Sequence, residues 1–334
     1  MLSYLDSLQR SEAYPHETGE IILRQTHISY ILLAGQYVYK IKKPVDFGFL
    51  NFTTLAKRKY YCEEELRLNR RLCPDIYLDV VPLKFVKGRY YFGGEAGDTV
   101  EYAVKMARMP EDRMMSNIIS AGKLSQNMLE SIVDTLVPFY RKAATGPGID
   151  EAGSPASVSA HFEQNFEQME MFVGCPALGR EQFTAIRTYA EDFISAAYHF
   201  QRRQEEGRVH DCHGDLHSAN ICLADKVYIF DCIEFNRGLR YGDVASDIAF
   251  LAMDLDYHGL KDMSANFVAL YEEKSGDDTM HDVMNYYKCY RACVRGKIGL
   301  FTAHASEIDE ATRSAGLEQA GRYFELAESY AAGQ

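Results

Sequence analysis

One short segment contains the residue types that phosphoryl transfer requires. The sequence HGDLHSAN (213–220) places Asp215 five residues before Asn220, and IFD (229–231) adds Asp231. Such a transfer needs a carboxylate that accepts the proton of the attacking hydroxyl, and hard oxygen ligands that hold Mg²⁺ on the nucleotide phosphates. The pattern therefore indicates Asp215 as the catalytic base and Asn220 and Asp231 as magnesium ligands.

The spacing also predicts how the last of these residues is positioned. The β-branched residues Val227 and Ile229 alternate along the chain, which is typical of a strand, and this strand would deliver Asp231 to the same cleft as Asn220. A simple polar turn between strands is the alternative interpretation. Three suitable residue types at suitable spacing favour the catalytic interpretation.

A zinc site is a second alternative for this segment. The residue types fit zinc at four positions: Cys212, His213, His217 and Cys222. Their C-H-x3-H-x4-C spacing matches none of the usual structural zinc patterns. The sequence therefore favours a catalytic loop, in which the cysteines fill apolar gaps and His213 supports the loop by packing and hydrogen bonding.

Two longer runs extend the pattern. HGDLHSANIC (213–222) and DCIEFNRGLRYGDVASDIAFLAMDLD (231–256) resemble the aminoglycoside phosphotransferase family, a branch of the protein-kinase-like fold that also includes choline kinases. More narrowly, they are similar to a bacterial group of predicted phosphotransferases, some of which carry an additional P-loop domain. The P-loop motif GxxxxGK[ST] does not occur in this sequence. The resemblance covers nearly the whole chain.

The resemblance implies a nucleotide-binding lysine and its partner. Lys40, in Val-Tyr-Lys (38–40), is similar to the strand lysine that grips the α- and β-phosphates, although the KIKK run (40–43) is also typical of a solvated strand edge. Lys40 and Lys42 share one side of a strand, so the choice between them depends on the V-x-K pattern. Glu65 resembles the helix glutamate that pairs with the lysine. Glu64 is the rival, but Glu65 shares a helical face with apolar residues.

Further site residues follow from the same resemblance. Met106 and Arg108 lie where the family has the strand end and hinge that meet adenine, and Asp247 is similar to the aspartate that fixes the catalytic loop. The phosphate-covering loop would be QTHISY (25–30), which contains no glycine. Ser29, with Thr26 and His27, is the candidate there for contacts with phosphate.

A late helix carries three cationic residues, Lys288, Arg291 and Arg295, and an apolar stripe runs beside them. A solvated helix face is one interpretation of this pattern. The other is that Arg291 and Arg295 border the acceptor site and bind a negatively charged substrate, which would argue against an aminoglycoside.

The elements that must position these residues change in type along the chain. Residues 1–109 have strand patterning around one helix (55–72), with Thr53 or Thr54 as its cap and Pro74 just beyond its end, and a hairpin break at Ala34-Gly35. Residues 110–334 are mainly helical, with amphipathic helices at 124–140 and 186–200 and a mobile loop rich in glycine, proline and serine at 145–157. We therefore expect an α+β, bilobal, protein-kinase-like fold: a nucleotide-binding lobe (1–109) and a catalytic and acceptor-binding lobe (110–334).

The composition of the chain limits which classes of molecule it is expected to bind and where it is expected to be located. The chain has 334 residues and a net charge of -12, which disfavours nucleic acid. Eight scattered cysteines indicate a reducing compartment, and the sequence shows neither a signal peptide nor a membrane span, so a cytoplasmic location is expected. The expected cofactors are ATP and Mg²⁺, and the expected partner is a small-molecule hydroxyl acceptor. The sequence does not determine the acceptor, the choice of ATP over GTP, or the oligomeric state.

The function expected from the sequence is transfer of the ATP γ-phosphate to a small-molecule hydroxyl. A nucleotide-binding pseudokinase or regulatory module is one alternative. A protein kinase is another, but only fifteen residues separate Asp231 from Asp247. That interval is too short for a substrate-docking activation segment.

Overall fold

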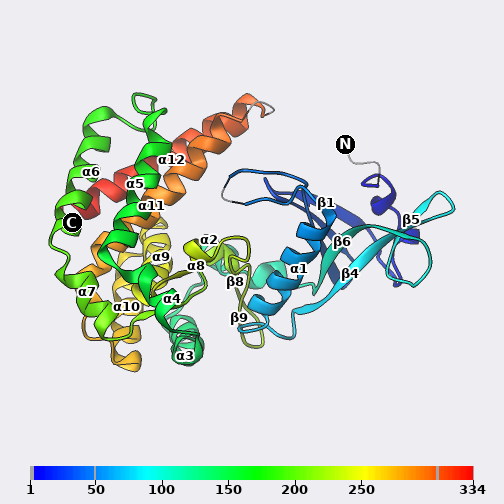
Figure 1. Cartoon of the computed structure of the whole chain (residues 1–334), viewed down its shortest axis with the longest axis horizontal. Helices are drawn as coiled ribbons and strands as arrows, with labels where there is room; N and C mark the ends of the chain where they lie inside the picture. The colour runs from blue at the N-terminus through cyan, green and yellow to red at the C-terminus, as the bar shows by residue number, and fades with distance from the viewer. Residues whose placement is uncertain (1–3, 49, 306–307, 334) are drawn as a thin grey trace. The chain divides into compact units, whose positions relative to one another are not determined.

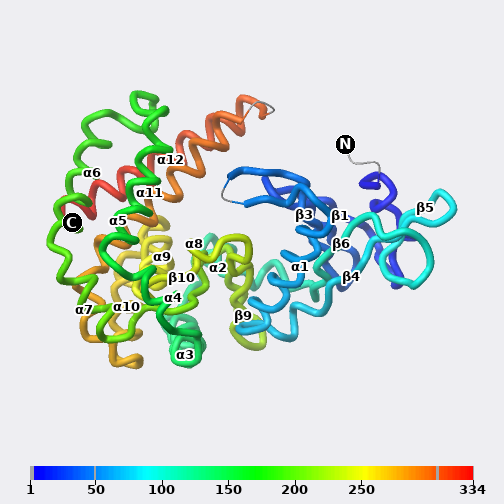
Figure 2. Tube along the Cα trace, in the orientation of Figure 1, coloured from blue at the N-terminus to red at the C-terminus, as the bar shows by residue number. Residues whose placement is uncertain are grey.

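A computed structural model describes residues 4–48, 50–305 and 308–333 (Figures 1 and 2). The chain forms two compact units. The first comprises Met1–Ala121 and Ala219–Arg237, and the second comprises Gly122–Ser218 and Gly238–Gln334. The first unit thus extends past the expected boundary at residue 109, and it also includes the later segment Ala219–Arg237. The chain passes from one unit to the other between Ser218 and Ala219, inside the HGDLHSAN sequence.

The first unit is built on a six-stranded antiparallel sheet. Its spatial order is β1-β2-β3-β6-β4-β5, and every neighbouring pair is antiparallel. The strands are β1 (Ile21–Gln25), β2 (Ser29–Ala34), β3 (Tyr37–Lys42), β4 (Tyr77–Val86), β5 (Arg89–Phe92) and β6 (Asp98–Ala107). The hairpin between β2 and β3 turns at Gly35, as predicted. A Cβ there would lie 2.6 Å from the carbonyl oxygen of Glu17, and φ is +61°.

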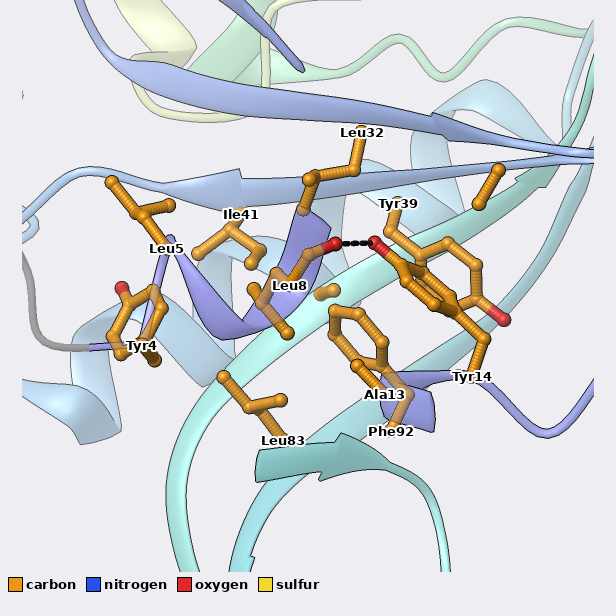
Figure 3. Close-up of a cluster of buried hydrophobic side chains, with 12 residues drawn as sticks. Tyr4, Leu5, Leu8, Ala13, Tyr14, Leu32, Tyr39, Ile41, Leu83 and Phe92 are labelled. Atoms are coloured by element: carbon orange, nitrogen blue, oxygen red, sulfur yellow. Dashed lines mark hydrogen bonds between the residues drawn. The ribbon is translucent and has the colours of Figure 1, made fainter. Parts of the chain in front are cut away.

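One face of this sheet is covered by the N-terminal segment (Figure 3). Two short 3₁₀ turns, Ser7–Gln9 and Ser11–Ala13, carry side chains into a cluster with β2, β3 and β5. The Tyr14 hydroxyl donates to the Leu8 carbonyl oxygen at 2.7 Å, and the Tyr39 ring stacks on Phe92. Because successive side chains of a strand point to opposite faces, Tyr39 and Ile41 in this cluster place Lys40 and Lys42 on the other face.

That other face is covered by helix α1 (Leu55–Asn69). Thr54 caps the helix, since its hydroxyl accepts from the Lys57 backbone N–H at 3.2 Å. Helix α1 buries Cys62, Glu65 and Leu68, and packs on β6 and β4. The helix predicted at 55–72 is confirmed, with an end three residues earlier.

The first unit is completed by segments that follow the sheet and by the returning segment. These are a 3₁₀ turn (Glu111–Arg113), α2 (Met115–Ser120), β8 (Ile221–Leu223) and β9 (Val227–Ile229). Strands β8 and β9 form an antiparallel hairpin, and a 3₁₀ turn (Ser218–Asn220) precedes it. Cys222 of β8 belongs to the same buried cluster as Cys73 and Tyr77. The strand predicted before Asp231 is therefore present.

The second unit is helical. Its helices are α3 (Gln126–Lys142), α4 (Pro147–Asp150), α5 (Pro155–Glu170), α6 (Arg180–Ser195), α7 (Tyr198–Glu205), α8 (Arg237–Arg240), α9 (Val244–Tyr257), α10 (Lys261–Ser275), α11 (His281–Ala303) and α12 (Glu310–Ala331). A two-stranded ribbon joins β7 (Val209–Asp211) to β10 (Tyr241–Asp243). Helix α11 packs against α9, α12 and α5 (Figure 1). None of the helices in the described ranges combines the length and low charge that a membrane span requires.

Small residues bring α11 and α12 close together. A Cβ on Gly296 would lie 2.6 Å from the Phe324 ring, and one on Gly299 would lie 3.1 Å from Ala320 and 3.2 Å from the Gly316 carbonyl oxygen. No side chain of α11 separates the two helices at these positions. This face of α11 is therefore fixed by its backbone.

Two predictions for this region were wrong. The segment 145–157 is not an open loop, because it folds into α4, a 3₁₀ turn (Glu151–Gly153) and the start of α5. There Ser154 caps α5 and Pro155 occupies its first turn, so residues typical of a loop serve as a helix start. The single helix predicted over 186–200 is divided into α6 and α7 at Ala197, whose φ is +43°.

Candidate active site

Lys40 is the centre of the polar cluster in the first unit. Its Nζ lies 2.9 Å from Glu65 Oε1 and 2.5 Å from Asp231 Oδ1, and the lysine is 9% exposed. Burial alone would lower the pKa of Lys40, but Asp231 and Glu65 raise it well above its usual value. Strand β3, helix α1 and the segment after β9 therefore meet at one ammonium group that stays charged.

Lys42 forms a second bridge on the same face of β3. Its Nζ lies 2.7 Å from Glu65 Oε2, and it also pairs with Glu234. Both Lys42 and Glu65 are fully buried. The sequence pattern did not single out Glu234, although its position three residues after Asp231 was a usable signal. It likewise did not show that both lysines point inward.

The pKa values of the two glutamates in this cluster, Glu65 and Glu234, shift in opposite directions. Burial would raise the pKa of Glu65, but Lys40 and Lys42 lower it to about 2. For Glu234 the burial effect prevails, and its pKa is raised despite Lys42. Glu64, the rival for contact with Lys40, instead forms a salt bridge with Arg67 at 2.7 Å on the outer side of α1.

Asn220 and Asp231 belong to the first unit and flank the β8–β9 hairpin. The Phe230 backbone N–H donates to the Asn220 carbonyl oxygen at 3.0 Å, which ties the two ends of the hairpin together. Asp231 has a φ of +62°, a left-handed conformation that a non-glycine residue rarely adopts. Its backbone N–H donates to the Tyr77 hydroxyl at 3.2 Å, and Asn69 Oδ1 accepts from the next N–H. The backbone around Asp231 is therefore held on both sides.

These two residues suit a magnesium ion in their chemistry. A carboxylate and a carboxamide supply the hard oxygen ligands that Mg²⁺ prefers. The Asp231 side chain is 43% exposed while Asn220 is 7% exposed, so an oxygen of Asp231 remains accessible to a ligand even while Lys40 contacts it. No cluster of three or more His, Cys, Asp or Glu side chains that could hold a metal occurs among the described residues.

Asp215 belongs to the second unit and is surrounded by nitrogen groups. His217 Nε2 lies 3.5 Å from Asp215 Oδ2, and the Asp215 backbone N–H donates to His213 Nδ1 at 3.3 Å. Burial alone would raise the pKa of Asp215, but His217, Arg295 and His213 lower it well below its usual value. The carboxylate is therefore ionised at neutral pH, which is the state that can accept a proton.

The loop that carries Asp215 is held through its backbone by two buried carboxylates. Asp247 Oδ2 accepts from the His213 N–H at 2.7 Å, and its Oδ1 accepts from the Gly214 N–H at 3.0 Å. The Tyr140 hydroxyl donates to the same carboxylate at 2.9 Å. Asp254, which the sequence pattern did not identify, accepts from the Ser218 N–H at 2.8 Å. Both aspartates project from α9.

The cations of α11 do not form a solvated face. Lys288 is buried against Asp256 at 2.9 Å. Arg291 is also buried: Nη1 donates to the Gly214 carbonyl oxygen at 2.9 Å, and Nη2 lies 3.3 Å from Asp247 Oδ1. This guanidinium is thus bound to the loop of Asp215 and is not part of a solvated helix face, while its place beside the acceptor stays a prediction. Arg295 is half-buried and its Nε approaches the Tyr323 hydroxyl at 3.4 Å.

Ser29 does not lie where a phosphate contact would require it. Its side chain is fully buried, because the first residue of β2 pairs with Lys42 in the interior of the sheet. Its backbone N–H donates to the Thr26 hydroxyl at 3.0 Å and so closes the β1–β2 turn. The assignment of Ser29 as a phosphate contact is therefore corrected.

Met106 and Arg108 lie at the end of β6, where the family resemblance placed a hinge. Met106 pairs with Val38 and Tyr77, inside the sheet. The Arg108 backbone N–H donates to the Gln36 carbonyl oxygen at 2.9 Å, and its side chain lies 3.7 Å from Glu111. The Arg108 N–H is therefore not available to a nucleotide base, and adenine bound at this edge would need another hydrogen-bond donor.

The comparisons with known sequences give relatives without an assigned activity. No family model matches the chain. It is 32% identical over 280 residues to an uncharacterized protein of Mycobacterium tuberculosis and, equally, to one of Mycobacterium bovis. The match covers 83% of this chain and 54% of each relative, so the chain spans about half the length of these curated relatives.

The comparisons with solved structures show the fold. A choline/ethanolamine kinase family protein from Mesorhizobium loti matches with a TM-score of 0.53 at 11% identity, over 96% of this chain and 95% of that one. An aminoglycoside 2'-phosphotransferase in its GDP complex matches at 0.50 and 15% identity, over 96% and 94% of the two chains. An aminoglycoside phosphotransferase of Streptomyces rimosus, solved with ADP and streptomycin, matches at 0.50 and 15% identity, over 86% and 97%. The predicted fold class, an antiparallel N-terminal sheet followed by a helical region, is confirmed.

Proposed function

We propose that the chain transfers the γ-phosphate of ATP to a hydroxyl group of a small molecule. The observation that carries the proposal is the contact of Lys40 with both Glu65 and Asp231. A strand lysine paired with a helix glutamate, beside an aspartate that can bind metal, is the arrangement that kinase-type phosphoryl transfer needs. The fold shared with small-molecule kinases supports this proposal.

In the proposed mechanism, Asp215 orients the acceptor hydroxyl and accepts its proton. Its lowered pKa keeps the carboxylate ionised, and Asp247 fixes the loop by holding the His213 and Gly214 N–H groups. Lys40 places its positive charge beside the α- and β-phosphates, and Glu65 keeps it oriented. Catalysis by these residues is mainly positioning and electrostatic stabilisation.

Asn220 and Asp231 would hold Mg²⁺. When bound, this ion would neutralise charge on the β- and γ-phosphates. Asp231 also contacts Lys40 in the protein, so the carboxylate is already oriented toward the cluster before nucleotide arrives. The acceptor would bind in the second unit, where Arg295 is the α11 cation whose charge acts on Asp215.

A phosphotransfer screen tests the proposal. ADP release is measured with Mg²⁺ and ATP or GTP across sugars, amino alcohols, aminoglycosides, nucleosides and hydroxy acids, against a control without acceptor. We expect at least one acceptor to stimulate ADP release, with phosphate recovered on that acceptor by mass spectrometry. Stimulation that persists in Asp215→Asn would contradict the assigned base, and nucleotide binding without any stimulated release would favour a binding module.

A further inference from the structure

The seam between α5 and α11 in the second unit contains a lysine that has no counter-ion among the described residues. Lys297, on α11, donates to Asn165 Oδ1 and to Gln168 Oε1, the latter at 2.7 Å. Both acceptors are neutral carboxamides of α5. Within residues 4–48, 50–305 and 308–333, no carboxylate lies within 4.0 Å of this ammonium, whereas Lys288 and Arg291 on the same helix each have one.

In the described part of the chain, a buried donor without an acceptor lies beside this lysine. Asn165 is 3% exposed, and its Nδ2 has no hydrogen-bond partner in the described part of the chain. Its Oδ1 is occupied by Lys297, so the ammonium and the free N–H group lie on either side of one carboxamide. Buried polar groups are nearly always hydrogen-bonded, which makes the unpartnered Asn165 Nδ2 exceptional.

The electrostatics of the seam also favour an incoming negative charge. Burial lowers the pKa of Lys297 to about 8, because no carboxylate offsets the desolvation of the ammonium. An anion at this position would accept hydrogen bonds from both donors and raise the pKa of Lys297 toward its ordinary value. A cation here would be repelled.

The seam between α5 and α11 ends beside a cavity. Arg291 on α11 contacts the loop of Asp215, and Lys297 lies about 9 Å further along the helix axis at 1.5 Å per residue. One turn beyond Lys297 and Gln168, a cavity of about 370 Å³ is lined by Met171, Phe172, Val173, Cys175, Phe301 and His304. The seam therefore has space beside it for a small molecule.

We propose that Lys297 and Asn165 form the subsite for an anionic oxygen group, carboxylate or phosphate, of the acceptor. This inference rests on the proposed phosphotransferase function for the role of the ligand, but the anion site itself does not. The substrate class is then a small hydroxy compound that carries a negative charge. Polycations such as aminoglycosides are disfavoured.

The first test measures the amine of Lys297 directly. The full chain is acetylated with a trace of acetic anhydride between pH 6 and 11, and the extent at each lysine is read by peptide mass spectrometry. We expect the Lys297 profile to have its midpoint near pH 8, and to be shifted upward by glycerate, glycerol 3-phosphate or inorganic phosphate. Exposed Lys142 is the internal control, and its profile should not respond to these anions.

The arms of this test separate the sources of the anion. Protection by glycerate alone assigns a carboxylate, protection by glycerol 3-phosphate and inorganic phosphate assigns a phosphate, and protection by streptomycin in their place overturns the proposal. A Lys297 profile that none of the anions shifts at millimolar concentration overturns it as well. Because acetylation does not require turnover, this result is independent of the proposed reaction.

Variants complete the test. Asn165→Asp supplies a built-in counter-ion, so it should raise the Lys297 midpoint and abolish protection by anions. Lys297→Met should raise the acceptor KM at least tenfold with little change in kcat, and Lys297→Arg should largely restore it, while all three retain a cooperative melt. Anion protection without Asp215-dependent transfer would refute the proposed function and keep the anion site. If phosphate transfer occurs and Lys297→Met leaves the acceptor KM unchanged, the subsite is refuted while the proposed function stands.

Discussion

The two ends of the segment from His213 to Glu234 are held by opposite means. In the second unit, buried carboxylates of α9 accept from backbone N–H groups, so Asp247 and Asp254 hold the loop by its main chain. In the first unit, buried lysines of β3 hold side chains, namely Asp231 and Glu234. Main-chain anchoring fixes Asp215 whatever ligand is bound. Side-chain anchoring leaves the oxygens of Asp231 free to exchange a lysine for another cation.

The largest effect should come from Asp215→Asn, which leaves both anchoring systems intact. Asparagine keeps the shape of the side chain but cannot accept a proton at neutral pH. We expect turnover to fall by about 10²–10⁴-fold, the usual contribution of a general base. ADP release with an identified acceptor measures the loss, while a thermal melt and an ATP titration serve as controls. A variant that melts normally and keeps more than about a tenth of wild-type turnover would exclude Asp215 as the base.

Asp247→Ala tests the main-chain anchor. The change leaves Arg291 buried beside the loop without its carboxylate and removes the acceptor of the His213 and Gly214 N–H groups. Removal of one partner of a buried pair typically costs about 3–5 kcal/mol, and we expect a loss of that size in the free energy of unfolding. Urea denaturation measures it. A loss below about 1 kcal/mol would show that the loop does not depend on this carboxylate.

Glu65→Gln and Glu234→Gln form a matched pair, because both carboxylates contact Lys42. The pKa of Glu65 is lowered from 4.5 to about 2, so its ionised form stabilises the fold above pH 4.5 and this stabilisation is lost as pH falls from about 4.5 to 2. At pH 7, Glu65→Gln should therefore cost about 3 kcal/mol.

The pKa of Glu234 is raised, so the fold favours its neutral form and stability declines as pH rises from 4.5 through the folded-state value. Glu234→Gln should accordingly cause no loss at pH 7. Denaturation curves between pH 3 and 8 compare the two variants. Equal losses at pH 7 would contradict the assignment of opposite roles.

A small effect on folding is also expected from Asp231→Ala. Lys40 keeps Glu65 as a partner, and the Asp231 side chain is 43% exposed, so we expect a change of less than about 1 kcal/mol in stability. Binding of MgATP should nevertheless weaken at least tenfold, while binding of ADP in EDTA changes little. Calorimetric titration with and without Mg²⁺ separates the two cases. Equal weakening in both would remove Asp231 from the metal site.

The sequence predicted most of the helices and strands but missed some of the contacts between residues that are distant in sequence. Helix α1 and the hairpin at Gly35 could be predicted because a capping threonine and a turn glycine act locally. The division of α6 from α7 at Ala197 could not, since no glycine or proline marks the left-handed residue. Segment 145–157 was misjudged because serine and proline are equally typical of loops and of helix starts.

The candidate site shows the same limit. Asp215 belongs to a spacing that a single sequence displays, whereas Lys40 and Glu65 were predicted from the family resemblance. The inward position of Lys42 depends on which face of β3 the N-terminal turns cover, through Tyr39 and Ile41. The engagement of Arg291 with Gly214 depends on how α11 packs on α9. These are tertiary relations between residues distant in sequence, and no local pattern encodes them.

Helix α11 has one side that is packed tightly against α12 and another side that is partly exposed. Gly296 and Gly299 fix one side of it against α12, where even a methyl group would meet the Phe324 ring or Ala320. Lys297, Ile298 and Phe301 occupy the other side, and Ile298 and Phe301 are each 44% exposed. Substitutions on that side change what the helix presents without altering how it is seated. In an evolving lineage, the glycines would stay constant while the exposed side diverged, so that descendants could adopt new acceptors on an unchanged frame.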